Sequence, residues 1–438
     1  MKRYDSYKDS GVKWLGEIPS HWEMLALKHI LKHKKEVVGK RSSQYDLLSL
    51  TLKGVIIRDM DNPEGKFPAS FDTYQIVEPN DFIFCNFDNE ETPRAVGLSQ
   101  YKGMITGAYD VLYRNNPLLS DKYLIYYFLY IDDSKRFKPL YKGLRKTVPF
   151  DSFMSYKIPV PSRGEQDAVV EYLDAATSKI DEAIAQQQKM IDLLNERKQI
   201  IINNAVTKGL DPNVPMKDSC IDWIGNIPVH WKVCKFNNVI CILTDYTANG
   251  SFGDLAKNVH YQSEGYARLV RLTDLRENLQ NENGVWVDRH GYDYLSKSSL
   301  FGGELLMANV GAYSGLPCIM PIVDYPTSLA PNMFLIKQDE SKITTNYLYY
   351  LLLSKSYFSW LQTIALSSAQ PKLNKDNIRS LPILLPPKSE QERITNSIQQ
   401  SLKPIEKAIS ISNNQISLLQ ERKQIIINDV VTGKVKVV

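Results

Sequence analysis

The sequence lacks the long apolar runs and the paired cysteines that mark membrane and secreted proteins. No apolar run approaches the ~20 residues that span a bilayer, and the opening MKRYDSYKDSG has no apolar segment typical of a secretory signal. We therefore expect a cytoplasmic protein without membrane contact. The 5 cysteines form no CxxC pair, so we expect reduced thiols rather than a zinc site or disulfide framework.

An excess of one charge is also missing. The formal net charge of the 438-residue chain is +4, which excludes a histone-like or polybasic membrane-binding protein but leaves room for local basic patches. Hydrophobic residues make up 43% of the chain, an ordinary globular value. The length predicts more than one domain, at about 150 residues per domain.

Motifs of the common catalytic classes are absent too. There is no GxxxxGK[ST] phosphate loop, no GxGxxG before a helix, no HExxH and no GxSxG. The 6 histidines show no metal-ligand spacing, so we expect no metal site. His21 and His230 lie beside tryptophans in a repeated block, and we interpret them as packing and hydrogen-bonding residues. A binding module suits the sequence better than an enzyme.

What the sequence does contain is an internal repeat. Residues 8–22, KDSGVKWLGEIPSHW, recur as residues 217–231, KDSCIDWIGNIPVHW. Residues 193–207, LLNERKQIIINNAVT, recur as residues 418–432, LLQERKQIIINDVVT. The interiors between these blocks differ strongly. The pattern predicts two copies of one fold with a constant framework and different working surfaces; the alternative is a duplication without division of labour.

The second repeated block belongs to a long predicted helix in each copy. Residues 165–207 contain no proline or glycine, and a stripe with a spacing of three and four runs from Val170 to Ala205 and again from Thr395 to Val430. The stripes predict a coiled-coil seam; a helix packed only on its own domain is the alternative. Since the first helix leads into the second copy, the pair should be antiparallel with pseudo-twofold symmetry.

Three residues are important for how the two helices would pair and where the second would begin. Gln187 and Ser412 lie at the stripe midpoints, where an antiparallel pair would bring them together to fix the register. Pro404 should cost about 3 kcal/mol inside a helix, so we expect the second helix to bend there or to begin near residue 404.

A pseudo-twofold protein with two unlike domains suits duplex DNA, whose backbone has local twofold symmetry. Segment 23–157 has 20 Lys and Arg against 17 Asp and Glu, and segment 232–382 has 14 against 13. Because this excess is weak, we expect a partner to supply much of the electrostatic contact. Side chains on predicted loops that pair with phosphates or base edges are our candidate DNA contacts, a solvated charged surface being the alternative. They are Arg94, Lys142, Arg145, Lys146, Arg268, Arg271, Arg276, Gln370, Lys372 and Asn374.

The repeated blocks, and the exits IPVPSRGEQ and PILLPPKSEQ before the helices, resemble the specificity subunit of type I restriction-modification systems. The resemblance covers essentially the whole chain, although Cys220 stands where the first copy has Gly11. It implies two similar α+β target recognition domains, residues 1–160 and 210–386, with a pseudo-twofold internal repeat. They would be separated by two long antiparallel helices, residues 161–209 and 387–438, that form a coiled-coil spacer.

The resemblance also implies a function. Each recognition domain would read one half of a bipartite, asymmetric site in double-stranded DNA, and the chain itself would be non-catalytic. Methyltransferase (modification) subunits and restriction/translocase subunits would be its partners in adenine methylation and ATP-dependent restriction. S-adenosylmethionine, ATP and Mg would be used by those partners, with no cofactor bound by this chain. The alternative is a coiled-coil adaptor whose two heads bind proteins.

Overall fold

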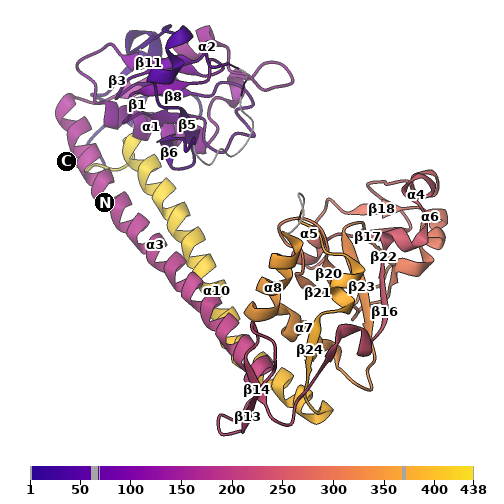
Figure 1. The fold of residues 1–438 in the computed structure, drawn as a ribbon. Helices are drawn as coiled ribbons and strands as arrows, with labels where there is room; N and C mark the ends of the chain where they lie inside the picture. Colours follow the sequence, from indigo (N-terminus) through magenta and orange to yellow (C-terminus); the bar gives the residue numbers. More distant parts are fainter. Residues whose placement is uncertain (1, 61–67, 69, 367–370, 438) are drawn as a thin grey trace. The chain divides into compact units, whose positions relative to one another are not determined.

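The computed structural model describes residues 2–60, 68, 70–366 and 371–437, and the chain forms two compact units (Figure 1). The first unit comprises Met1–Gln188 and Asn413–Val438, and the second comprises Lys189–Ser412. Each unit contains one α+β domain and one half of each of two long helices. The α+β fold class expected from the sequence is confirmed.

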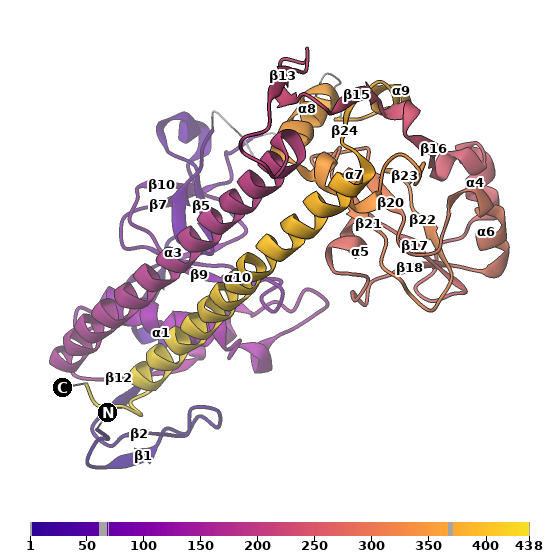
Figure 2. The same cartoon turned by 90° about the horizontal axis from the view of Figure 1, so that it is seen from below.

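The long helices contain the repeated stripes. Helix α3 spans Arg163–Lys208 and helix α10 spans Lys388–Val431. In the first unit the beginning of α3 packs with the end of α10, and in the second the end of α3 packs with the beginning of α10 (Figure 2). The helices are therefore antiparallel in both units, as expected.

Equivalent ion pairs join the two helices in each unit. Lys423 Nζ lies 2.7 Å from a carboxylate oxygen of Asp181 in the first unit, and Lys198 Nζ lies 2.7 Å from Glu406 in the second. The lysines correspond to each other in the helical repeat, and so do the two acids. The pseudo-twofold relation seen in the sequence thus extends to side-chain contacts within each unit.

Pro404 lies inside α10 and does not end it. The expected start of the helix near residue 404 is wrong. Proline removes the N–H that would bond the carbonyl of Gln400, but Gln400 is exposed, so water can hydrate that carbonyl. Leu402 and Ile405 on either side are buried, and their packing stabilises the helix across the proline.

Both domains contain the same four-stranded antiparallel sheet, covered by an equivalent helix, α1 (Asp121–Asp133) or α7 (Thr345–Leu353). The strand order is β4-β11-β8-β9 in the first domain and β16-β23-β20-β21 in the second. The strands are β4 (Leu31–His33), β8 (Phe82–Phe84), β9 (Val96–Leu98) and β11 (Asp110–Arg114), and β16 (Ile240–Asp245), β20 (Leu305–Ala308), β21 (Pro317–Ile319) and β23 (Met333–Gln338).

Short two-stranded ladders formed by the repeated blocks and the exits are equivalent as well. In the first unit β1 pairs with β2 and β3 with β12; in the second β13 pairs with β14 and β15 with β24. These strands are β1 (Tyr7–Asp9), β2 (Glu17–Pro19), β3 (Glu23–Ala26), β12 (Lys157–Val160), β13 (Met216–Asp218), β14 (Asn226–Pro228), β15 (Lys232–Lys235) and β24 (Pro382–Leu385).

The domains differ in the elements added to this framework. The first adds the pairs β5–β6 and β7–β10, whereas the second adds a sheet of order β18-β17-β22-β19 and the short helices α4, α5, α6 and α8. The first set is β5 (Leu48–Thr51), β6 (Gly54–Ile57), β7 (Gln75–Val77) and β10 (Gly103–Ile105). The second set is β17 (Ala267–Val270), β18 (Val285–Val287), β19 (Ser299–Leu300), β22 (Thr327–Leu329), α4 (Phe252–Asn258), α5 (Leu272–Arg276), α6 (Arg289–Tyr294) and α8 (Lys355–Ala365). The short helices α2 (Phe150–Ser155) and α9 (Lys375–Arg379) belong to the shared framework, because each lies just before an exit strand, β12 or β24.

The repeated histidines fasten each block to the start of a long helix. His21 Nε2 lies 2.8 Å from Glu165 Oε1, and His230 Nε2 lies 2.7 Å from Glu390 Oε2. The neighbouring Trp22 is fully buried, as is its counterpart in the second block. The packing and hydrogen-bonding role expected for both histidines is confirmed.

A buried tyrosine in each domain binds the end of the other long helix. Tyr123 Oη lies 3.2 Å from the carbonyl oxygen of Pro159 and 3.5 Å from that of Val431 in α10. In the second domain Tyr347 contacts the carbonyls of Leu384 and Val206 at the same distances.

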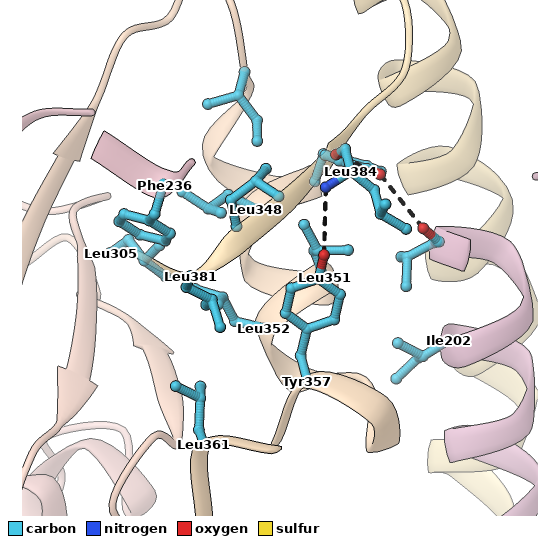
Figure 3. Packing of buried hydrophobic residues seen from close by; sticks show 14 of the residues in the cluster. Ile202, Phe236, Leu305, Leu348, Leu351, Leu352, Tyr357, Leu361, Leu381 and Leu384 are labelled. Atoms are coloured by element: carbon cyan, nitrogen blue, oxygen red, sulfur yellow. Dashed lines mark hydrogen bonds between the residues drawn. The ribbon is translucent and has the colours of Figure 1, made fainter. Parts of the chain in front are cut away.

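Figure 3 shows the core around this contact in the second unit. Ile202 of α3 lies beside Tyr357, whose Oη accepts the N–H of Leu384 at 3.3 Å. The end of α3 and the second domain therefore share one continuous hydrophobic core.

A buried glutamine at the start of each long helix completes the junction. Gln166 accepts the N–H of Ser120 at 2.7 Å and donates to the carbonyls of Leu118 and Pro161. Gln391 makes the equivalent three contacts in the second unit.

We expect Gln391→Ala to lower the free energy of unfolding by about 3 kcal/mol, because it deprives three backbone groups of their partner at a buried position. The exposed Gln186→Ala in α3 is the matched control and should change it by less than about 0.5 kcal/mol. Urea unfolding of the full chain measures both. Equal effects of the two substitutions would contradict a structural role for Gln391.

Candidate nucleic-acid interface

In the first domain, three predicted contacts lie together in one short hairpin, residues 142–147. The backbone N–H of Lys142 bonds the carbonyl of Thr147 at 2.9 Å, and the N–H of Thr147 bonds the carbonyl of Lys142 at 3.0 Å. Arg145 and Lys146 lie in the turn between these two residues and are at least partly exposed. The structure therefore brings Lys142, Arg145 and Lys146 to one edge of the domain.

The charge of Arg145 is paired within the domain. Its guanidinium Nε lies 3.2 Å from Asp88 Oδ2, and its carbon atom Cζ lies 4.9 Å from the centre of the Phe87 ring. The hydrogen bonds from Arg145 lower the pKa of Asp88, so the carboxylate is charged at neutral pH. Arg145 thus fixes the hairpin to the loop after β8.

Lys146 shares a carboxylate with another lysine. Glu90 accepts from Lys138 at 2.8 Å and also pairs with Lys146. These two hydrogen bonds lower the pKa of Glu90 to about 2. One negative charge faces two positive charges, and Lys142 has no side-chain partner among the described residues. The hairpin therefore keeps an excess of positive charge.

Arg94 lies elsewhere in the first unit. It donates to the carbonyl of Leu52 at 3.2 Å and lines a groove of about 1170 Å³, together with Lys122, Asp181 and Lys423. The groove separates β9 and the β5–β6 hairpin from the long helices. The structure does not place Arg94 with the hairpin at residues 142–147.

In the second domain, Arg268 is buried, with 4% of its surface exposed. Its guanidinium donates to the carbonyl of Leu279 at 2.7 Å and to Asn281 Oδ1 at 2.6 Å, and it lies 3.5 Å from Asp274. A guanidinium enclosed in this way cannot reach a phosphate without unfolding its surroundings. The structure assigns Arg268 to the domain core, so we no longer propose it as a DNA contact.

Arg271 precedes the short helix α5, and Arg276 is its last residue. Arg271 caps its start and makes two side-chain hydrogen bonds to Asp274, at 2.9 and 2.8 Å. Burial opposes the charge on Asp274, but hydrogen bonds from Arg271 and Asn281 outweigh it and lower the Asp274 pKa. Arg276 is exposed, with its Cζ 4.7 Å from the centre of the Tyr313 ring.

Two adjoining hollows lie on the second domain. One has a volume of about 490 Å³ and includes Arg271 in its wall, and the other, of about 400 Å³, includes Lys372 and Asn374. The side chain of Asn374 accepts the N–H of Asn377 at 2.8 Å and so caps α9. Gln370 lies outside the described residues. The structure therefore places Arg271, Lys372 and Asn374 around two hollows that share part of their wall, on one surface of the second domain.

Asn332 lines both hollows and was missed in the sequence. Its backbone has a φ of +70°, a left-handed conformation that asparagine tolerates better than most residues. Its side-chain amide has no hydrogen-bond partner among the described residues. The only signal in the sequence was the turn-forming pair Pro331 and Asn332 before a strand.

The predicted register residues lie in different units. Gln187 belongs to the first unit and is partly exposed, whereas Ser412 belongs to the second and is buried. Their meeting in an antiparallel pair stays a prediction.

The described part of the chain has neither a metal cluster nor a membrane-spanning helix. No three His, Cys, Asp or Glu side chains there are grouped so that they could bind a metal ion. None of the helices there combines the length and the apolar character that crossing a bilayer requires.

Known proteins resemble the chain in sequence and in fold. Residues 290–419 match the family described as type I restriction modification DNA specificity domain. The chain is 24% identical to the type I restriction enzyme MjaVIII specificity subunit of Methanocaldococcus jannaschii, over 98% of this chain and 97% of that protein. It is 20% identical to the EcoDI specificity subunit of Escherichia coli, over 69% and 67% respectively.

The fold comparison gives the same result. A chain from a solved structure, described as addressing complex assembly and conformational transition of the type I R-M system, aligns with a TM-score of 0.64. The alignment covers 94% of this chain and 98% of that chain, at 12% identity. The two chains therefore share their fold.

We expect Arg268→Ala to destabilise the second domain by about 3 kcal/mol, because it removes a buried ion-pair partner of Asp274. Arg276→Ala, in the exposed position over Tyr313, should cost less than about 1 kcal/mol. Chemical unfolding of both variants tests this difference. A stable Arg268→Ala variant with weakened DNA binding would return Arg268 to the candidate contacts.

Proposed function

We propose that this chain, a member of the specificity subunits of type I restriction-modification systems, is a non-catalytic subunit that reads a bipartite, asymmetric DNA site. Residues 1–160 and 210–386 are the two recognition domains, and each reads one half-site. Residues 161–209 and 387–438 are the helical spacer between the half-site readers. The subunit acts in the cytoplasm, on double-stranded DNA.

One observation supports this proposal above all others. Both domains have the same four-stranded sheet and the same junction with the long helices, but they differ in every element added to that framework. A constant framework with different exposed elements is what two readers of unlike half-sites require. An adaptor that binds the same protein twice would need equivalent surfaces on both domains.

The contacts of each candidate residue indicate whether it suits a DNA phosphate or a base. Lys142, whose side chain has no partner in the part of the chain that the structure describes, suits phosphates, which position a protein on DNA without reading sequence, and so do the exposed Arg276 and Lys372. Asn332, whose side-chain amide is likewise without a partner there and borders the two hollows, suits the N6 and N7 edge of adenine. Gln370 remains a candidate from the sequence for the same kind of contact.

The chemistry belongs to partner subunits in this proposal. Modification subunits would methylate adenine with S-adenosylmethionine, and restriction/translocase subunits would use ATP and Mg. This chain would bind none of these cofactors and would determine where on the DNA the partners act.

The outer faces of the long helices offer a place for such partners. In the second unit Leu193 and Ile200 are 52% and 53% exposed, and in the first unit their repeat equivalents Leu418 and Ile425 are 64% and 50% exposed. Leucine and isoleucine one heptad apart form an apolar stripe on a helix surface. Ile200 also borders a hollow of about 550 Å³ with Leu353 and Phe358.

Because the repeat keeps this stripe in both copies, we infer that each stripe binds one copy of the same modification subunit. A single asymmetric partner would not require the same side chains in two places. Framework residues thus serve partner binding, and the added elements serve DNA.

Exchange of the first variable segment tests the proposed function. Replacing residues 23–157 by the corresponding segment of another specificity subunit should change one half-site and leave the other unchanged. The motif methylated by the assembled complex is the readout, and the wild-type complex is the control. A change in both half-sites, or in neither, would rule out independent readers. Binding of proteins by the full chain, without any DNA preference, would favour the adaptor.

Substitution of the stripes tests partner binding. Leu193→Glu together with Ile200→Glu should remove one of two modification subunits, because charged side chains oppose burial of an apolar helix face. Leu418→Glu with Ile425→Glu should remove the other, and native mass spectrometry counts the copies. The exposed Gln186→Glu serves as the control. Full assembly of the fourfold variant would show that the partners bind elsewhere.

A further inference from the structure

Leu144 stands at the tip of the hairpin formed by residues 142–147, and its relative exposure is 103%. Among the described residues, Leu144 is the most exposed large apolar side chain. The next are Ile322 at 86% and Phe252 at 74%. A leucine in this position buries no apolar surface, so it adds nothing to the stability of the fold. Its whole side chain is therefore available to contact an external partner.

The hairpin holds Leu144 in a fixed place. The turn contains Gly143 with a φ of +69° and Lys146 with a φ of +44°, and the paired backbone groups of Lys142 and Thr147 close it. The carbonyl of Arg145 accepts the N–H of Asp88 at 2.7 Å. The tip is therefore ordered before any partner arrives, which reduces the entropy lost on binding.

The surroundings of Leu144 indicate the chemistry of that partner. Lys138 and Lys146 share the single carboxylate of Glu90, and Lys142 is unpaired among the described residues. The tip thus combines an apolar side chain with an excess of positive charge. Duplex DNA offers the complement of both, because its phosphates are negative and the thymine methyl group is an apolar feature of the major groove.

The corresponding stretch of the second copy has a different sequence. The N–H of Leu373 bonds the carbonyl of Asn309 at 2.8 Å, as the N–H of Val148 bonds that of Asn86 at 2.7 Å in the first domain. The six residues before Val148 in the sequence are KGLRKT, and the six before Leu373 are SSAQPK, of which 367–370 lie outside the described residues. A shared attachment point that follows different sequences is expected of domains that read unlike half-sites.

We propose that Leu144 is a specificity-determining residue of the first domain and contacts the methyl group of a thymine in the first half-site through the major groove. Lys142 contacts a neighbouring phosphate and orients the tip. This inference rests on the proposed function and adds to it a residue and the base group that the residue recognises.

The test uses the full chain assembled with its modification subunits and the duplex that the wild-type complex selects from a random-sequence library. Leu144→Ala should weaken binding to that duplex about ten-fold, the scale of a lost base contact, and leave unfolding unchanged. Leu118→Ala is the matched control, because Leu118 is 71% exposed in the same domain; its binding should equal that of the wild type.

Replacement of single thymines by deoxyuridine, which lacks the methyl group, identifies the contact. At one thymine of the first half-site, deoxyuridine should weaken wild-type binding about four-fold, the effect of one buried methyl group. The same replacement should have no effect on the Leu144→Ala complex. A uracil scan without such coupling, or unchanged binding by Leu144→Ala, would overturn the contact.

Two further outcomes are distinguishable. If Leu144→Ala lowers the number of bound partner subunits and leaves DNA selection unchanged, the tip is a protein contact and the inference is wrong. If the wild-type complex selects no sequence at all, the proposed function fails, and the Leu144 contact fails with it.

Discussion

The structure depends on the attachment of each domain to the end of the long helix that belongs to the other copy of the repeat. Tyr123 bonds the last turn of α10, and Tyr347 bonds the last turn of α3. Glycine follows each helix end with a left-handed φ, and a β-carbon at Gly433 would collide with Pro19. The first unit is built from two separate segments of the chain, and in the second the end of α3 packs on elements more than a hundred residues later, so each core forms only when distant segments meet.

This constraint explains why the framework was readable from the sequence. Residues that bond or pack against the ends of both long helices and against a domain can be replaced by few other residue types. Both copies therefore have Trp, His and Gln at the same positions. His21 with Glu165 and His230 with Glu390 are examples. The 3–4 spacing of the stripes followed from helix geometry. Pro404 misled the prediction of the helix start, because local propensity ignores the packing of Leu402 and Ile405.

The candidate site was less predictable, because its electrostatics depend on pairs that are close in space and distant in sequence. The sequence between Lys135 and Lys146 is rich in cations, but Asp88 and Glu90, about fifty residues earlier, pair with three of them. Arg268 lies three residues before Arg271, and the sequence predicted that both arginines are exposed. However, the strand β17 that contains Arg268 is buried throughout. Neither a count of charges nor a loop position shows such pairing. Asn332 and Leu144 became visible only through their lack of partners.

Pairing of the cations has a consequence for how a protein of this kind binds DNA. Unpaired lysines and arginines release counterions from any duplex and strengthen non-specific binding as much as specific binding. When Asp88 holds Arg145 and Asp274 holds Arg271, those cations stiffen the loops and contribute less to attraction by arbitrary DNA. Under the proposed function, discrimination would depend on the few side chains presented by stiff loops, and partner subunits would supply the remaining affinity. A weak net charge is therefore compatible with DNA recognition, provided that recognition requires the whole assembly.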